Sequence, residues 1–424
     1  MQNLRYNMER LSRYGANIGL ILGLIGLVPC AWAQTPITYN WTNTSGGVFG
    51  VAGNWSPSGG PPAKWGDAND EGDIIEFNLN SSDPYTVTFG AADNFGIVYV
   101  CTDKVIFNLG GNELLSGRIS SGSVFVGSGS GHTATLIVTN GTWYPFNHWQ
   151  IGHSGGTGTL INDGAWLKRG NVNISNYGYG TYIIRNGGRH TNAGNMLVGD
   201  KYAATMIISN AGSYKEVNGV VVKNNSELVL ADGGYLQCAM RIGIYSNSVA
   251  TLNGGELRLR QGTTYSDVNY HLDLRGTLRG TGIVTNYFDD KLYSAVNSGS
   301  IEPGGAGAVG QLTLYNASYT QTTGVVKFEI AGGNPGEYDR LVIGGPATFE
   351  AGASCEVTFL EAYAPTQTTA YQLMSATSFS GEIGTVNLPA LPPQWRWDTS
   401  QLQVTGELIA ERPPSRRGTV ITIN

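Results

Sequence analysis

Apolar and polar residues alternate in short runs along most of the chain, and between residues 121 and 260 this pattern repeats. Each copy holds an apolar pair and then a turn that begins with Asn or Asp and carries Gly. The expected first residues of these turns are 23, 23, 24, 22 and 21 residues apart: Asn140, Asp163, Asn186, Asn210, Asp232 and Asn253. Residues at the same position of successive copies are therefore expected to be structurally equivalent.

Three positions of the copy are mainly apolar. Three residues before the turn stand Ile137, Leu160, Ile183, Ile207, Val229 and Ala250. Two residues before it stand Val138, Ile161, Ile184, Ile208, Leu230 and Thr251. About a dozen residues further upstream stand Val126, Ile151, Ile174, Val198, Val222 and Ile242. Each copy therefore contains at least two short strands.

A period in the low twenties, with β-branched strands and Gly-bearing turns, predicts a solenoid, because one copy cannot bury its apolar face without its neighbours. We expect an all-β fold: a right-handed parallel β-helix (β-solenoid) with irregular N- and C-terminal caps, the hand following from the preference of parallel crossovers. Equivalent residues of successive rungs would lie about 4.8 Å apart, so the apolar columns would form the inner wall. Leucine-rich repeats, the nearest alternative in length, need a regular Leu pattern that is absent here.

Three stretches carry a resemblance to a known class of protein. Val126–Gly141, Ile151–Ala165 and Val198–Gly212 resemble the β-strand repeat associated with type V secretion (autotransporter) passengers and PEP-CTERM proteins. The resemblance covers roughly the middle third of the chain. It implies a passenger-like β-helix that is secreted or exposed at a bacterial surface, and it brings no catalytic residues with it.

The first 33 residues have the pattern of a secretory signal peptide. Three arginines precede an apolar run at Ile18–Val28, and Ala31 and Ala33 form a small-x-small cleavage site before Gln34. The run is shorter than the about 20 residues that span a bilayer, so no membrane span is expected in the mature chain. A lipoprotein signal at Cys30 is the alternative, but Pro29 stands where a small residue is needed.

The repeat and the signal peptide divide the chain into six expected segments. They are the signal peptide (1–33), an N-terminal cap with irregular first rungs (34–120), regular repeats (121–260), looser closing rungs (261–360), a C-terminal cap (361–410) and a flexible tail (411–424). Arg416 and Arg417 precede only a few apolar residues, so the tail is not expected to be an anchor.

Composition narrows the possible partners. The chain has a net charge of −6, and removal of the signal peptide leaves 22 basic and 30 acidic residues, a net charge of −8. Without a basic cluster to neutralise phosphates, nucleic acid is not an expected partner.

The mature chain keeps Cys101, Cys238 and Cys355, an odd number of widely spaced thiols, which does not indicate a disulfide framework.

Few residues of the sequence are candidates for catalysis or metal binding. Parallel β-helices host polysaccharide lyases and hydrolases, whose chemistry needs clustered carboxylates. The best candidate is Asp289 and Asp290 with His271, Asp273 and Lys291 nearby, for which a solvated turn is the preferred interpretation. The acidic loop Asp67, Asp70, Glu71 and Asp73 lacks calcium-loop spacing, and the histidines fall at unrelated repeat positions. No catalytic residue, metal site or cofactor is therefore expected.

One column suggests binding. Counting from the turns aligns five residues: Trp143, Trp166, Arg189, Tyr214 and Tyr235. Stacked a rung apart, they would form an aromatic strip able to contact sugar rings or another protein, or a structural stack that covers a corner. The sequence thus favours a structural or adhesive β-helix at the cell surface, with a polysaccharide or a surface protein as partner. The alternative is a carbohydrate-active β-helix enzyme, a polysaccharide lyase or hydrolase.

Overall fold

The computed structural model of the protein describes residues 36–58, 60, 62, 72–116, 124–192, 194–215, 218–259, 271–286 and 292–413. Apart from a 3-10 turn at Ala52–Asn54, the regular elements of these residues are all strands. The signal peptide with Ala31 and Ala33, the Asp289–Lys291 segment and the Arg416–Arg417 tail lie outside the described residues.

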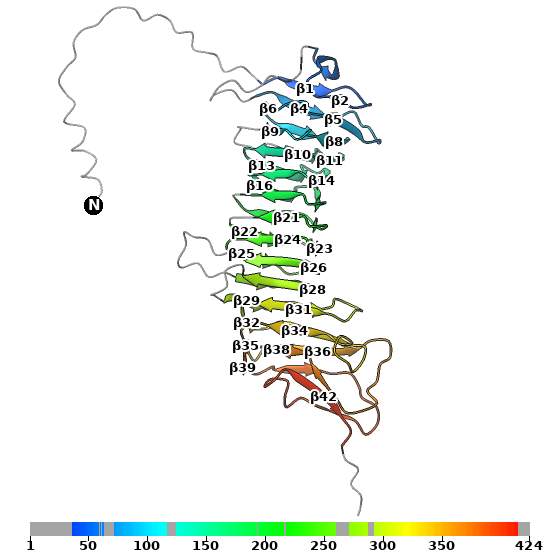
Figure 1. Ribbon diagram of the computed structural model, residues 1–424, viewed down its shortest axis with the longest axis vertical. Coiled ribbons are helices and arrows are strands. Elements are labelled where there is room, and N and C mark those ends of the chain that lie inside the picture. The colour runs from blue at the N-terminus through cyan, green and yellow to red at the C-terminus, as the bar shows by residue number, and fades with distance from the viewer. Residues whose placement is uncertain are drawn as a thin grey trace, which may run out of the picture. The chain divides into compact units, whose positions relative to one another are not determined.

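The chain crosses three faces in each turn of a parallel β-solenoid. One typical rung consists of β13 (His148–His153), β14 (Thr157–Asp163) and β15 (Trp166–Lys168), and the next of β16 (Asn171–Asn176), β17 (Tyr179–Arg185) and β18 (Arg189–Thr191). Each strand pairs in parallel with its equivalent one rung later: β13 with β16, β14 with β17 and β15 with β18. In Figure 1 the rungs follow one another in chain order. The all-β solenoid expected from the repeat is therefore confirmed, while its right-handed sense stays a prediction.

We name the three faces by the strands that form them. Face 1 contains β1 (Thr38–Trp41), β4 (Ile74–Phe77), β7 (Val98–Val100), β10 (Val124–Ser128), β13, β16, β19 (Met196–Val198), β22 (Gly219–Val222), β25 (Arg241–Ile244), β27 (His271–Leu274), β29 (Tyr293–Asn297), β32 (Ala317–Gln321), β35 (Pro346–Phe349) and β39 (Ser378–Gly381). Face 2 contains β2 (Gly47–Val48), β5 (Tyr85–Thr88), β8 (Lys104–Asn108), β11 (Thr133–Thr139), β14, β17, β20 (Ala204–Ile208), β23 (Glu227–Ala231), β30 (Ser300–Pro303), β33 (Val325–Ile330), β36 (Ser354–Phe359) and β40 (Thr385–Asn387). Face 3 contains β6 (Asp93–Phe95), β9 (Glu113–Ser116), β12 (Thr142–Pro145), β15, β18, β21 (Ser213–Lys215), β24 (Tyr235–Cys238), β31 (Gln311–Tyr315), β34 (Arg340–Ile343) and β38 (Met374–Ser375). The long strands β26 (Val249–Leu259) and β28 (Thr277–Asn286) run through faces 2 and 3 and join them into one sheet.

The inner wall of face 2 uses alternate residues, and both expected columns mix inward with outward side chains. Leu160 and Ala250 of the first column point inward, whereas Ile161 and Thr251 of the second point outward. The inward columns are Leu136, Leu160, Tyr182, Met206, Leu228 and Ala250, and Val138, Asn162, Ile184, Ile208, Leu230 and Leu252. The residues between them point outward and are mostly half-buried: Ile137, Ile161, Ile183, Ile207, Val229 and Thr251. Adjacent residues of a strand point to opposite faces, so two neighbouring columns cannot both line the core. On face 1 the inward column continues from Val222 to Ile244, not to Ile242.

The turns between faces 2 and 3 also correct the expected alignment. The first residue with left-handed backbone geometry in each turn is Asn140, Gly164, Asn186, Asn210, Asp232 or Gly254, with φ between 49° and 79°. Asp163 and Asn253 therefore stand one residue too early, because Gly adopts positive φ more readily than any other residue. The true spacings are 24, 22, 24, 22 and 22 residues.

Both ends of the described solenoid depart from the regular rung. At the N-terminal end, β3 (Trp55–Ser56) pairs with β1 in antiparallel fashion, and the rings of Trp41 and Trp55 meet edge to face with centroids 5.0 Å apart. At the C-terminal end, an antiparallel sheet contains β37 (Thr369–Gln372), β42 (Glu407–Glu411) and β41 (Arg396–Asp398). Apart from Glu411, which falls in the expected tail, these elements lie in the segments for which caps are expected, and the limits of those segments stay predictions.

Candidate functional site

Face 3 carries an outward column with large side chains at three of four successive rungs. Trp166 of β15 pairs with Arg189 of β18, Arg189 pairs with Ser213 of β21, and Ser213 pairs with Tyr235 of β24. Trp166 and Arg189 are exposed and Tyr235 is half-buried. Three of the five residues expected in the strip therefore share one column.

Trp143 and Tyr214 do not belong to this column. Both point inward and are 0% exposed, in a column that contains Trp143, Leu167, His190, Tyr214 and Leu236. The Trp143 Nε1 donates a hydrogen bond to the Ser116 hydroxyl at 2.8 Å, and the Asn192 amide donates one to the Tyr214 hydroxyl at 3.1 Å. These rings fill the core, so no ligand outside the solenoid reaches them.

The turns between faces 2 and 3 differ in length, which is why a fixed count from the turn misplaces Trp143. Outward strand residues follow the left-handed turn residue by two positions at Thr142 and Trp166, but by three at Arg189, Ser213 and Tyr235. A shift of one residue moves a side chain to the other face of its strand. A fixed offset from the turn therefore mixes inward and outward positions.

Two lysines that the sequence reasoning missed complete the surface. Lys168, Thr191 and Lys215 form the second outward column of β15, β18 and β21. The Lys168 ammonium lies 3.8 Å from the centroid of the Trp166 ring and 4.3 Å from that of the Tyr144 ring. It also donates a hydrogen bond to the Tyr144 hydroxyl at 2.8 Å. Alternation from Trp166 and Ser213 would have found both lysines, since residues two apart on a strand share a face.

The same arrangement recurs further along face 3. The Arg258 guanidinium carbon lies 3.9 Å from the Tyr235 ring centroid, and the Lys215 ammonium lies 5.8 Å from it. The Trp166 indole N–H donates a hydrogen bond to the Thr191 hydroxyl at 3.2 Å. Cations above aromatic faces are attracted by the ring quadrupole, so these rings hold the basic side chains in place.

The two columns border an open groove of about 340 Å³, lined by Trp166, Arg189, Lys215 and Tyr235 among others. We call this the face 3 groove. On β15, β18, β21 and β24 the charged side chains are Lys168, Arg189 and Lys215, with no carboxylate among them, and His190 is buried. The groove thus presents positive charge on a protein that is acidic overall.

Cations elsewhere are often neutralised by carboxylates. Ion pairs join Arg185 to Asp163, Lys223 to Asp200, Arg241 and Arg275 to Asp273, Arg258 to Glu256, Arg279 to Glu227 and Lys327 to Glu302. Within the described residues, no carboxylate forms an ion pair with Lys168, Arg189 or Lys215. These three cations remain available to an anionic ligand.

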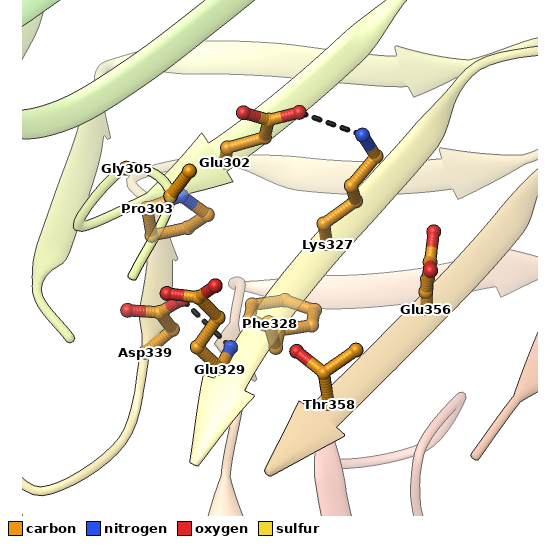
Figure 2. Close-up of a pocket in the computed structure, with 10 residues that line it drawn as sticks. Glu302, Pro303, Gly305, Lys327, Phe328, Glu329, Asp339, Glu356 and Thr358 are labelled. Atoms are coloured by element: carbon orange, nitrogen blue, oxygen red, sulfur yellow. Dashed lines mark hydrogen bonds and ion pairs between the residues drawn. The ribbon is translucent and has the colours of Figure 1, made fainter. Parts of the chain in front are cut away.

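A second pocket, of about 230 Å³, brings together carboxylates that the sequence reasoning also missed (Figure 2). The register of β30, β33 and β36 aligns Glu302, Lys327 and Glu356 in one outward column. Glu302 and Lys327 form an ion pair at 2.8 Å, and Glu329 and Asp339 lie at the other side of the pocket. This column becomes visible only once the register between rungs is known.

Two of these carboxylates hold the loop that borders the pocket. The Glu329 carboxylate accepts hydrogen bonds from the backbone N–H groups of Gly307 and Ala308, at 3.0 and 2.9 Å. Asp339 is 1% exposed and accepts hydrogen bonds from the backbone N–H groups of Gly310 and Glu329. Burial raises the pKa of Asp339 to about 8, although these N–H donors oppose the shift. Asp339 and Glu329 are thus committed to the loop.

The candidates for catalysis and metal binding are only partly described. Asp273 forms ion pairs with Arg241 and Arg275, and His271 stands two residues before it on β27. Asp73 is buried and accepts a hydrogen bond from the Ile37 N–H at 3.0 Å. Of the acidic loop, Asp67, Asp70 and Glu71 lie outside the described residues. Among the side chains that the structure describes, no group of three or more His, Cys, Asp or Glu residues is arranged to hold a metal ion.

Fold and surface together define a parallel β-solenoid with a cationic and aromatic groove on one face. No protein-family model matches the chain, and no curated protein matches it. A similar solved structure is that of the Hap adhesin of Haemophilus influenzae, at 13% sequence identity and a TM-score of 0.27. The match covers 80% of this chain, which spans 47% of the adhesin. In the described part of the chain, no helix has the length and apolarity needed to cross a bilayer.

Proposed function

We propose that the protein is exported and acts as a structural or adhesive solenoid that binds a surface polymer through the face 3 groove. The observation that carries the proposal is the outward column of Trp166, Arg189 and Tyr235. Lys168 and Lys215 flank this column and form no ion pair among the described residues. Such a regular surface contacts a polymer at several rungs, and weak contacts add up through multivalency. Export is supported by the signal-peptide pattern of residues 1–33.

Retention on immobilised cell-surface polysaccharides tests this proposal. We expect the Trp166→Ala, Tyr235→Ala double variant to elute earlier than the unchanged protein. Tyr315→Ala is the matched control, because Tyr315 is a 51% exposed aromatic residue of β31, also on face 3 but outside the groove. Equal melting temperatures would exclude unfolding as the cause. Unchanged retention of the double variant would overturn the assignment of the groove.

A polysaccharide lyase or hydrolase is the second candidate, and the four carboxylates around the pocket in Figure 2 favour it. Asp339 and Glu329 hold a loop, and Glu302 pairs with Lys327, which leaves Glu356 as the acidic group most available to a substrate. Incubation with pectin and alginate, with and without Ca²⁺, tests this activity. New reducing or unsaturated ends that vanish in Glu356→Gln, or in the Asp289→Asn, Asp290→Asn double variant, would overturn the non-catalytic proposal.

A further inference from the structure

The ligand class of the face 3 groove follows from its charges. Resting on the proposed function, we infer that the groove binds an acidic polysaccharide, a linear polymer with repeated carboxylate or sulfate groups, laid along the solenoid axis. Arg189 and Lys215, which line the groove, and Lys168, which stands beside it, contact the anionic groups, and the aromatic rings position the two lysines.

The rings are partly occupied by the cations of the protein itself. Lys168 lies against Trp166 and Tyr144, and Arg258 lies against Tyr235. A ring face that already carries an ammonium or guanidinium group is not free to stack on a sugar. Its contribution is to reduce the freedom of a long basic side chain before binding, which lowers the entropy lost when a ligand arrives. The groove is thus preorganised for anions more than for neutral sugar faces.

The spacing of the cations suits a chain molecule. Lys168, Arg189 and Lys215 belong to β15, β18 and β21, three consecutive strands of face 3. Consecutive strands are about 4.8 Å apart, so a polymer along the axis meets a cation at every rung. Exposed ion contacts are weak one at a time, but a chain with repeated charges engages all three at once.

The rest of the protein argues against nucleic acid as the ligand. The chain has a net charge of −6, and binding to the dense phosphate charge of nucleic acid depends on many basic contacts. Single-stranded nucleic acids also require free aromatic faces for base stacking, and here cations lie against these rings. An acidic polysaccharide carries one charge at each repeat and needs no base stacking, so it matches three cations in a row.

The test compares the full chain, after loss of residues 1–33, with two charge-matched triple variants on four probes: polygalacturonate, its fully methyl-esterified form, dextran and single-stranded DNA. We expect polygalacturonate to bind, methyl esterification to abolish binding, and added salt to weaken it. Lys168→Gln, Arg189→Gln, Lys215→Gln should reduce the affinity by roughly tenfold or more, because three charge-assisted contacts are lost. The control, Lys104→Gln, Lys201→Gln, Arg340→Gln, removes three cations outside the groove, and we expect it to bind like the unchanged protein.

Two further variants test the positioning role of Trp166. Trp166→Leu should weaken binding of polygalacturonate, whereas Trp166→Phe should restore part of the affinity by keeping a ring beneath Lys168. A purely apolar contact with the sugar would instead respond equally on dextran. All variants are compared at equal melting temperature and circular dichroism.

The possible outcomes separate this inference from the proposed function. The inference would be refuted if dextran and polygalacturonate were retained equally and the groove triple variant had no effect. The polymer-binding proposal would still stand in that case. Failure of every polysaccharide to bind would refute both. Single-stranded DNA binding more tightly than polygalacturonate, with loss in the groove variant, would replace the polysaccharide by nucleic acid.

Discussion

His190 offers a quantitative test of the inward register on face 3. It is an inward residue of β18 with 0% exposure, and its Nδ1 lies 2.6 Å from the Tyr182 hydroxyl. Its ring packs between those of Trp149 and Tyr214, with centroid distances of 5.8 and 4.9 Å. Burial lowers the pKa of His190 from 6.5 to about 3, and the backbone carbonyl of Arg169 opposes this only in part.

The lowered pKa makes the fold sensitive to acid. Between pH 6.5 and about 3 the unfolded chain takes up a proton at His190 that the folded chain does not, so stability falls as the pH falls. With these two pKa values, the free energy of unfolding drops by about 2 kcal/mol between pH 7 and pH 5 from this residue alone. The stability that neutral His190 contributes is fully present above pH 6.5 and is lost on acidification.

His190→Leu removes this titration with a residue suited to the site, because the same inward column contains Leu167 and Leu236. The Tyr182 hydroxyl loses its hydrogen bond with His190, so the variant is expected to be less stable at pH 7 by about 1–3 kcal/mol. The diagnostic quantity is the difference between pH 7 and pH 5. We expect the unchanged protein to lose about 2 kcal/mol more than the variant over this range.

Urea unfolding followed by tryptophan fluorescence at the two pH values measures this difference. Burial also lowers the pKa of His148 and His153, but both proteins contain these residues, so their contribution cancels in the comparison. Equal pH dependence of the two proteins would show that His190 titrates normally in the folded chain. The inward register of β18 would then be wrong.

Three further predictions concern the wall, the core and processing. Ile184→Asp should cost several kcal/mol of unfolding free energy because it buries an unpaired charge. Ile183→Asp, on the outward side of the same strand, should change the melting temperature little. Similar melting temperatures of the two variants would contradict the register. Trp143→Ala should cost about 3–5 kcal/mol of unfolding free energy, since it empties a fully buried site. A melting temperature equal to that of the unchanged protein would show that the Trp143 ring lies outside the solenoid. N-terminal sequencing of the exported protein should begin at Gln34, and a lipidated Cys30 would show that the cleavage site is wrong.

The fold could be predicted from the sequence because the same turn and apolar positions recur in successive rungs of a solenoid. Recurring Asn-Gly and Asp-Gly turns and apolar pairs identify rungs even when one copy deviates, as Gly164 does by taking the left-handed position that Asp163 was expected to hold. An error of one residue in the alignment of the copies leaves the predicted period and fold class unchanged. The inward or outward direction of a side chain does not, because it changes with every residue along a strand.

The candidate site shows this limit directly. Trp166 and Trp143 look equivalent when counted from the expected turns, yet one is 40% exposed and the other is fully buried. The carboxylate column of Glu302 and Glu356 carried no local signal, since the two residues are neighbours only through the pairing of β30, β33 and β36. Such relations depend on the exact length of each rung, which a degenerate repeat does not specify.

The two sides of the wall are under different constraints, and the proposed binding surface lies on the outward side. Inward columns must fill the interior, so Leu167, His190 and Tyr214 pack as one continuous core. Outward columns are free of that requirement, yet those of the successive strands β15, β18 and β21 carry Lys168, Arg189 and Lys215, and no carboxylate of the described residues forms an ion pair with them. Like charges on neighbouring rungs repel one another. An arrangement that costs stability in the free protein is explained if a bound polyanion compensates for it.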